Sequence, residues 1–405
     1  GPVQRIIAVS PIRPGNPAHP PLFHVAGATM IALFGYSTDT IALTNTVFFV
    51  LLLFGCFALA RTFLDRWQSL FVVFVVSMTP VIFAASRFYM TDYATAAFVV
   101  WAVVALVRSE GLHRSNWVFL FGLLSGLGIL TRTVTVGYLI VPGILAVLIG
   151  AGRCIRRKDD RTLESPTFGT YLVNIVMALT VCVGIFAPWY YTNLEPFYDY
   201  WANKEIGNRR GPLTNFVPRV QPVPAADPGV STVTPTPNPM TKDVISYALA
   251  RVKNPDVAWI RYPVYLVNNG LFVPLATLAV LGMLVAFFRK QNRVSTLLYL
   301  YAWILGSWFF FSVILRSGTP RYGLPVAPAL AFFAALFILA LPGRWFRQGM
   351  GVLLSAVLLF QFGNLSVIPY GAFAEWTLPA PALEKESRHF IDDGLVLYKD
   401  SLTLS

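Results

Sequence analysis

Apolar runs long enough to cross a lipid bilayer recur along almost the whole chain, and they constrain its fold more than any other feature. A spanning helix needs about 20 apolar residues, whereas a strand of an outer-membrane barrel is about ten residues long and alternates apolar with polar positions. The runs here are continuous and do not alternate. The sequence therefore predicts an all-α polytopic membrane protein.

We expect about ten spanning helices from the apolar pattern. They lie near residues 40–60, 69–86, 92–108, 116–131, 134–151, 170–190, 264–288, 294–315, 323–341 and 349–368. The segment 20–35, "PPLFHVAGATMIALFG", is apolar but short, and its opening prolines disfavour an early helix start. We interpret it as a helix at the membrane interface. An eleventh span is the alternative.

The composition supports a membrane protein and argues against a nucleic-acid partner. The chain is 56% hydrophobic and 12% charged, about half the charged share that is usual in soluble domains. Its net charge of +12 resides mostly between apolar segments, as the positive-inside rule produces, so we expect no nucleic acid to bind. No cluster of His, Cys, Asp or Glu has metal-ligand spacing, so a divalent metal site is unsupported.

The basic residues are distributed unequally between the two sides that alternating spans define. With segment 20–35 at the interface, the short loops on one side hold only Arg87, Arg132, Arg316 and Arg321. The other side receives Arg61, Arg66, Arg108, Arg114, Arg153, Arg156, Arg157, Lys158, Arg161, Arg289, Lys290, Arg293, Arg344 and Arg347. The richer side is expected to be cytoplasmic, so the four isolated arginines are expected on the extracytoplasmic face.

This topology divides the chain into five parts. Residues 1–39 are the remainder of a first outer loop with a juxtamembrane helix, and residues 40–190 are a first group of transmembrane helices. Residues 191–263 form a large, proline-rich extracytoplasmic loop, flanked by aromatic segments expected at the membrane surface. Residues 264–370 hold a second group of transmembrane helices, and residues 371–405 are an extracytoplasmic C-terminal segment.

The outer arginines are the candidate anion site. Arginine is disfavoured on this side, and its planar fork suits phosphate, so an anion would account for its presence. Arg87 and Asp92 lie in "SRFYMTD", while His19 and His24 lie in "HPPLFH". Alternatives remain open for each residue: arginines reaching lipid headgroups, Asp92 capping the helix that starts beside it, and His24 bonding to a neighbour.

The motifs "HPPLFH", "RFYMTD", "GILTRT", "FAPWYYTN" and "GTPRYGLPVAPAL" occur in an order that resembles GT-C glycosyltransferases. The resemblance covers nearly the whole chain. It is to the branch of protein O-mannosyltransferases and lipid A aminoarabinose transferases, especially bacterial dolichyl-phosphate-mannose-protein mannosyltransferase-like proteins. It implies a GT-C-like helical bundle with juxtamembrane helices and one large outer loop.

The resemblance also implies roles for individual residues. His19 would lie by the donor phosphate, Arg132 and Arg321 with Tyr322 would line the lipid-phosphate side, and Asp92 would be the second acidic residue of the site. The general base of the family is a carboxylate upstream of "HPPL", yet this chain has no Asp or Glu before Asp39. We expect that a first span and its acidic loop precede Gly1.

The function implied is an inverting transfer of a sugar from a polyprenyl-phosphate donor to a protein, lipid or glycan acceptor. The expected location is the bacterial inner membrane, with the active site on the extracytoplasmic side and the lipid bilayer, donor and acceptor as partners. The alternatives are a lipid-linked oligosaccharide polymerase or ligase, a transporter or flippase, and a non-catalytic relative. Internal repeats and charges near the bilayer centre, which are typical of transporters, are not apparent.

Overall fold

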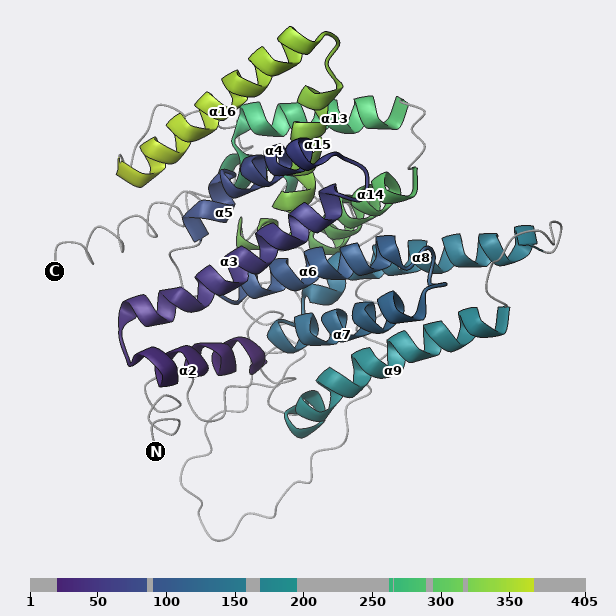
Figure 1. Ribbon diagram of the computed structural model, residues 1–405. Coiled ribbons are helices and arrows are strands. Elements are labelled where there is room, and N and C mark those ends of the chain that lie inside the picture. The colour runs from purple at the N-terminus through teal and green to yellow at the C-terminus, as the bar shows by residue number, and fades with distance from the viewer. Residues whose placement is uncertain are drawn as a thin grey trace, which may run out of the picture. The chain divides into compact units, whose positions relative to one another are not determined.

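The computed structural model describes residues 20–85, 90–157, 168–194, 262–264, 266–288, 294–315 and 320–367 (Figure 1). Residues 20–187 and 256–405 form one compact unit. Residues 1–19 and 188–255 form another, of which only residues 188–194 are described. The account below concerns the larger unit, residues 20–187 and 256–405. Residues 188–192, which end a long helix, belong to the other unit. The predicted segments 1–19 and 371–405 and most of the loop 191–263 lie outside the described residues.

The first half of the unit consists of helices joined by short turns. Their bounds are α2 (Leu22–Phe34), α3 (Thr38–Ala60), α4 (Arg66–Ser77), α5 (Pro80–Ala85), α6 (Thr91–Arg108), α7 (Ser115–Thr131), α8 (Thr135–Arg157) and α9 (Phe168–Thr192). Two helix starts follow from their sequence. Ser37 caps α3 by accepting from the Thr40 N–H, and Asp65 forms a capping box with Gln68 at the start of α4.

The second half contains shorter helical pieces as well as long helices. Their bounds are η3 (Val267–Leu271), α13 (Val273–Phe288), α14 (Val294–Phe309), η4 (Phe310–Ile314), η5 (Pro320–Gly323), α15 (Ala327–Ala340) and α16 (Arg344–Val367). The segments η3 and η4 are π-helical, and η5 is a 3₁₀ turn. No strand occurs in the described ranges, which confirms the predicted all-α polytopic fold.

Six described helical segments are long and apolar enough to cross a membrane. They are 39–60, 91–108, 135–155, 168–192, 296–314 and 344–363. The other predicted spans correspond to shorter apolar helices, α4, α7, α13 and α15, and α2 is also short. Every apolar run that was predicted to span therefore forms helix.

Two predicted spans are interrupted where hydropathy alone gives no sign of a break. Residues 69–86, predicted as one helix, are divided between α4 and α5, because Pro80 has no N–H to continue the helix and its ring crowds the preceding turn. Residues 264–288 are divided at Phe272, whose positive φ of 55° separates η3 from α13. The prediction of continuous helices was wrong at these points.

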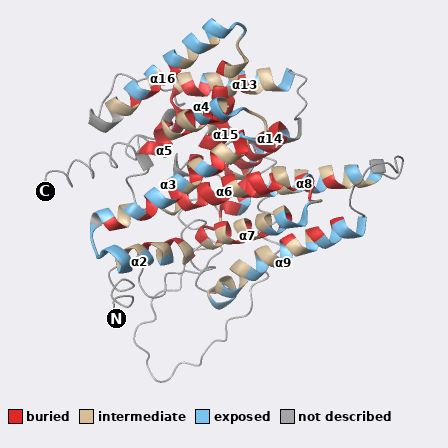
Figure 2. Ribbon diagram, viewed as in Figure 1, coloured by how far each residue is buried: buried red, intermediate tan, exposed pale blue. Residues whose placement is uncertain are grey.

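Burial is concentrated in α6 and the first part of α15. Every residue from Asp92 to Val100 and from Ala327 to Ala335 is buried, and these stretches are red in Figure 2. By contrast, α9 exposes Leu172, Val173, Val176, Leu179 and Val183. In a membrane protein such an apolar face is turned toward lipid. The charged first turn of α6 thus lies in the interior of the unit.

Glycines let two helix pairs approach closely. A Cβ at Gly282 of α13 would overlap the backbone carbonyl oxygen of Phe333 in α15. A Cβ at Gly122 of α7 would lie 2.6 Å from the carbonyl oxygen of Ala178 in α9. Small residues at such contacts are the usual means by which membrane helices pack, since close backbone approach replaces the hydrophobic effect as the main attraction.

Candidate functional site

The centre of the candidate site is an ion pair between Asp92 and Arg132. Asp92 lies in the first turn of α6, and Arg132 ends α7, with its N–H bonded to the Gly128 carbonyl at 2.8 Å. Nη1 of Arg132 donates to Oδ1 of Asp92, and the two side chains are 8% and 3% exposed. Two charges at this depth require each other, because an unpaired buried charge is very costly.

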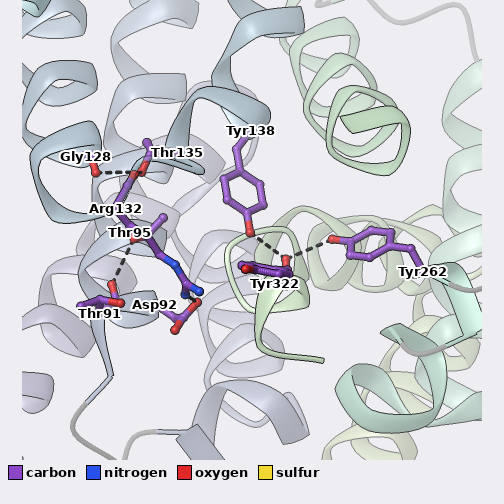
Figure 3. A network of polar contacts seen from close by, with 9 residues as sticks. All are labelled: Thr91, Asp92, Thr95, Gly128, Arg132, Thr135, Tyr138, Tyr262 and Tyr322. Atoms are coloured by element: carbon purple, nitrogen blue, oxygen red, sulfur yellow. Dashed lines mark hydrogen bonds and ion pairs between the residues drawn. The ribbon is translucent and has the colours of Figure 1, made fainter. Parts of the chain in front are cut away.

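Arg132 is held by a corner between two helices. Its backbone is extended (φ −160°, ψ 128°) and separates α7 from α8. The Thr135 hydroxyl lies 2.6 Å from the Arg132 carbonyl oxygen and 2.7 Å from that of Gly128, so it can donate to either (Figure 3). The residues "GILTRTVT" therefore form a rigid corner that turns the guanidinium toward α6.

The aromatic ring of Tyr322 completes this arrangement from the other half of the chain. Cζ of Arg132 lies 4.8 Å from the centroid of that ring, within the range of a cation–π interaction. Tyr322 belongs to η5 and is buried. Figure 3 shows the guanidinium between the Asp92 carboxylate and the Tyr322 ring. Three of the predicted site residues are thus in contact, although they come from different parts of the sequence.

The environment keeps Arg132 charged. Burial acts to lower the pKa of its guanidinium, but the Asp92 carboxylate and the neighbouring Tyr322 and Tyr138 act in the opposite direction, and the net effect is a raised pKa. Arg132 is therefore a cation at every physiological pH. It can supply positive charge at a position that excludes water.

Two tyrosines that the sequence did not single out hold Tyr322 in place. The hydroxyls of Tyr138 in α8 and Tyr262 in residues 262–264 both donate to the Tyr322 carbonyl oxygen, at 2.8 and 3.0 Å (Figure 3). Tyr262 is buried, whereas its segment was expected at the membrane surface. A tyrosine just beyond "TRT" and one before Pro263 were the only signals, and neither differs from ordinary interfacial tyrosines.

The remaining predicted residues fall into three groups. His19 and Arg87 lie outside the described residues. Arg321 lies in the same 3₁₀ turn as Tyr322, so its backbone is at the site, but its side chain is not among those described. His24 packs edge-on against Phe23 at 6.2 Å between ring centroids.

The alternative role of Asp92 as a helix cap is wrong. Met90 is the N-cap residue of α6, and its side chain makes no capping hydrogen bond. The Asp92 carboxylate is instead bonded to Arg132. In the part of the chain that the structure describes, no group of three or more His, Cys, Asp or Glu residues could hold a metal ion.

One family of known proteins matches part of the chain. Residues 18–186 match the family described as dolichyl-phosphate-mannose-protein mannosyltransferase. This stretch contains Asp92, Arg132 and Tyr138 but not Tyr262 or Tyr322. None of the curated proteins compared with the chain matches it.

Two solved structures, both of ArnT from Cupriavidus metallidurans, share its fold. The structure bound to undecaprenyl phosphate has a TM-score of 0.50 at 18% identity, with 94% of this chain and 60% of that chain covered. The apo structure has a TM-score of 0.53 at 18% identity, with 96% and 62% covered. The chain thus spans about three fifths of the length of the ArnT chains. It is a polytopic membrane protein that shares the fold of ArnT, and its residues 18–186 are similar to the mannosyltransferase family.

Proposed function

We propose that this protein transfers a sugar from a polyprenyl-phosphate donor to a protein, lipid or glycan acceptor on the extracytoplasmic face of the bacterial inner membrane. The observation that carries the proposal is the buried Arg132 guanidinium, set between Asp92 and the Tyr322 ring. A fixed cation in a water-excluding site is what a departing phosphate requires. The undecaprenyl phosphate bound to ArnT supports this class of lipid for the present chain.

The reaction assigns a distinct task to each residue of the site. An acceptor oxygen or nitrogen attacks the anomeric carbon, the bond from that carbon to the phosphate oxygen breaks, and polyprenyl phosphate leaves as an anion. Arg132 and Arg321 would stabilise this anion, and His19 would donate to the phosphate. The acceptor proton passes to a base. Because the Asp92 carboxylate is bonded to Arg132, we assign it to orienting that arginine rather than to taking the proton.

The geometry of arginine allows Arg132 to serve Asp92 and a phosphate together. A guanidinium carries five N–H donors in a planar fork. Asp92 takes one of these through Nη1, and the ring of Tyr322 lies against the guanidinium. A phosphate oxygen would bind donors of the fork that Asp92 does not occupy. The bound anion would then meet a guanidinium whose orientation is already fixed, which lowers the entropic cost of binding.

The extracytoplasmic location is proposed from charge. Arg132 and Arg321 lie in the connections that carry few basic residues, while the basic clusters of the chain lie in the alternate connections. The positive-inside rule assigns those clusters to the cytoplasm. The phosphate site would then open away from the cytoplasm, where a lipid-linked donor is presented after it has been flipped.

The test uses purified full-length protein in lipid nanodiscs. Binding of polyprenyl phosphate and transfer from a panel of polyprenyl-phosphate sugars are measured for wild type, Arg132→Ala and Arg321→Ala. We expect transfer to fall by about 100- to 1,000-fold in each variant, as for other groups that stabilise a developing anion. Arg114→Ala is the matched control, since Arg114 is exposed and paired with Glu110.

Two further observations make this test decisive. Arg132→Lys keeps the positive charge opposite Asp92 but lacks the fork, so it should fold normally and still bind polyprenyl phosphate more weakly. Full activity in both Arg132→Ala and Arg321→Ala would exclude the proposed phosphate site. Binding of the lipid without any transfer would favour a non-catalytic relative.

A further inference from the structure

One backbone carbonyl, that of Tyr322, accepts two tyrosine hydroxyls from separate parts of the chain. Tyr138 reaches it from α8 at 2.8 Å, and Tyr262 reaches it from the opposite side at 3.0 Å (Figure 3). All three residues are buried. A carbonyl oxygen has two lone pairs, so both of its acceptor positions are used. The carbonyl therefore cannot turn without losing a bond on one side or the other.

Burial favours the bond from Tyr262 by keeping its hydroxyl protonated. Removal of the phenol from water raises the pKa of Tyr262 above its ordinary range, so its hydroxyl keeps its hydrogen. A hydrogen bond that water cannot reach is also stronger than an exposed one. The carbonyl of Tyr322 is therefore held at all physiological pH values.

An aromatic stack fills the space among the three tyrosines. The ring of Phe311, in η4, stacks on Tyr322 at 4.9 Å and 19° and on Tyr262 at 5.4 Å and 22°. It also lies 4.9 Å from the ring of Tyr138. Offset stacking of this kind adds to the packing of the rings. Tyr322 is thus fixed at both its backbone and its ring.

The ring fixed in this way is the one against which Arg132 lies. The guanidinium carbon of Arg132 is 4.8 Å from the Tyr322 ring centroid, and its Nη1 bonds to Asp92. The position of the η5 turn therefore determines where the Tyr322 ring lies against the Arg132 guanidinium. The same turn contains Arg321. A displacement of the turn would move both the ring and the second arginine relative to the first.

We infer that Tyr138 and Tyr262 are positioning residues for the leaving-group site, holding the Pro320–Gly323 turn so that the Tyr322 ring keeps the Arg132 guanidinium in place for the phosphate. The inference rests on the proposed function. It extends that function to two residues whose hydroxyls act through the backbone of Tyr322 and do not touch the substrate. Reactive groups tolerate little displacement, since an error of about 1 Å can cost about 100-fold in rate.

The experiment removes each hydroxyl and keeps each ring. Tyr138→Phe, Tyr262→Phe and the double variant are compared with wild type for polyprenyl phosphate binding and for kcat and KM in sugar transfer. Each single change should weaken binding of the lipid phosphate by about 3- to 10-fold, in keeping with the loss of one internal hydrogen bond. In the double variant the loss should be larger, and kcat should fall as well.

Tyr171→Phe is the matched control. The Tyr171 hydroxyl also donates to a backbone carbonyl, that of Val147 at 2.7 Å, and Tyr171 is also buried, but the bond joins α9 to α8 away from the site. It should change the apparent melting temperature about as much as the other single variants and leave lipid-phosphate binding within about 2-fold of wild type. A merely structural role would give all three single variants the same profile.

A second comparison tests whether the hydroxyls act through Arg132. If they do, Tyr262→Phe should have little further effect on lipid-phosphate binding in an Arg132→Ala background, because the two changes would impair the same contact. Additive losses would contradict the inference. So would Tyr138→Phe and Tyr262→Phe variants whose binding and kcat equal those of Tyr171→Phe.

Wild-type behaviour separates the two proposals. If wild type binds polyprenyl phosphate and the tyrosine variants bind it equally well, the positioning inference alone is wrong. If wild type binds no polyprenyl phosphate, the proposed function is wrong, and the inference that rests on it fails as well.

Discussion

At the Asp92–Arg132 pair, two opposite charges lie side by side where both are almost fully enclosed. Their mutual attraction is offset by the cost of removing them from water, so such a pair contributes little to net stability and yet is very sensitive to the loss of one partner. This combination suits a functional site. The pair keeps a guanidinium in the interior, where it would meet the phosphate of the proposed donor.

Asp92→Asn removes the negative charge and leaves Arg132 buried without its counter-ion. We expect a loss of about 3–5 kcal/mol in stability, the typical cost of an orphaned buried charge. The measurement is thermal unfolding of the purified protein in detergent. Asp92→Asn combined with Arg132→Gln should be more stable than Asp92→Asn alone, because the double variant has no unpaired charge. Simple addition of the two single losses would contradict a direct pair.

Some residues of the candidate site could be predicted from the sequence, and others could not. Asp92, Arg132 and Tyr322 could be selected because charge at an outer helix end is unusual and because their motifs occur in a familiar order. Tyr138 and Tyr262 could not, since a tyrosine beside an apolar run is common and its partner is a backbone atom far along the chain. A backbone acceptor leaves no mark in a sequence. The roles predicted for His19 and Arg87, and for the side chain of Arg321, stay predictions.

At the scale of helices, contact between backbones sets how the bundle packs. Gly282 of α13 lies directly against the backbone of α15, next to Phe333. Most of the facing part of α15 consists of buried alanine and phenylalanine residues. A flexible side chain could yield to an added methyl group, but a carbonyl in a helix cannot move without displacing the helix. The α13–α15 pair is therefore intolerant of larger residues at this glycine.

Gly282→Ala should lower stability by about 1–3 kcal/mol or more, the usual penalty for overpacking a core. Gly184→Ala in α9 is the control, because a Cβ there meets no atom within 4 Å. That change should be neutral or stabilising, since alanine favours helix over glycine. The apparent melting temperature and the monodisperse yield after solubilisation report the difference. Equal behaviour of the two variants would disprove the close packing at Gly282.

Helix content was predictable, and helix continuity was not. Apolar composition forces backbone hydrogen bonds to be made within a segment, so each long apolar run had to become helix. The division of residues 69–86 into α4 and α5 and the π-helical pieces η3 and η4 depend on local backbone angles, to which hydropathy is insensitive. One of these irregular pieces, η4, supplies Phe311 to the aromatic stack.

At the scale of the whole molecule, the proposed arrangement depends on which ends of the helices face the cytoplasm. In the proposed orientation, which follows the positive-inside rule, the first turn of α16 would face the cytoplasm and the last turn of α9 the opposite side. Trp345 and Tyr191, which lie in these turns, are 84% and 85% exposed. They make a matched pair of reporter positions, because their accessibility is equal and only the side of the membrane should differ.

Tyr191→Cys should react with a membrane-impermeant maleimide in intact cells, and Trp345→Cys should react only after the cells are permeabilised. Both changes are made in a chain from which the native cysteines are removed, namely Cys56, Cys154 and Cys182. Mass-tag gel shifts give the extent of labelling in each case. The opposite pattern would reverse the proposed orientation and place Arg132 on the cytoplasmic side.

The hydroxyls of Tyr138 and Tyr262 donate to the backbone carbonyl oxygen of Tyr322, a group that every amino acid has. These two hydrogen bonds do not depend on the side chain at position 322, although the stacking on Phe311 and the contact with Arg132 do. Such a position is suited to directed evolution: a library at residue 322, with Tyr138 and Tyr262 kept, would vary the surface beside Arg132 while the two hydrogen bonds to the turn are retained.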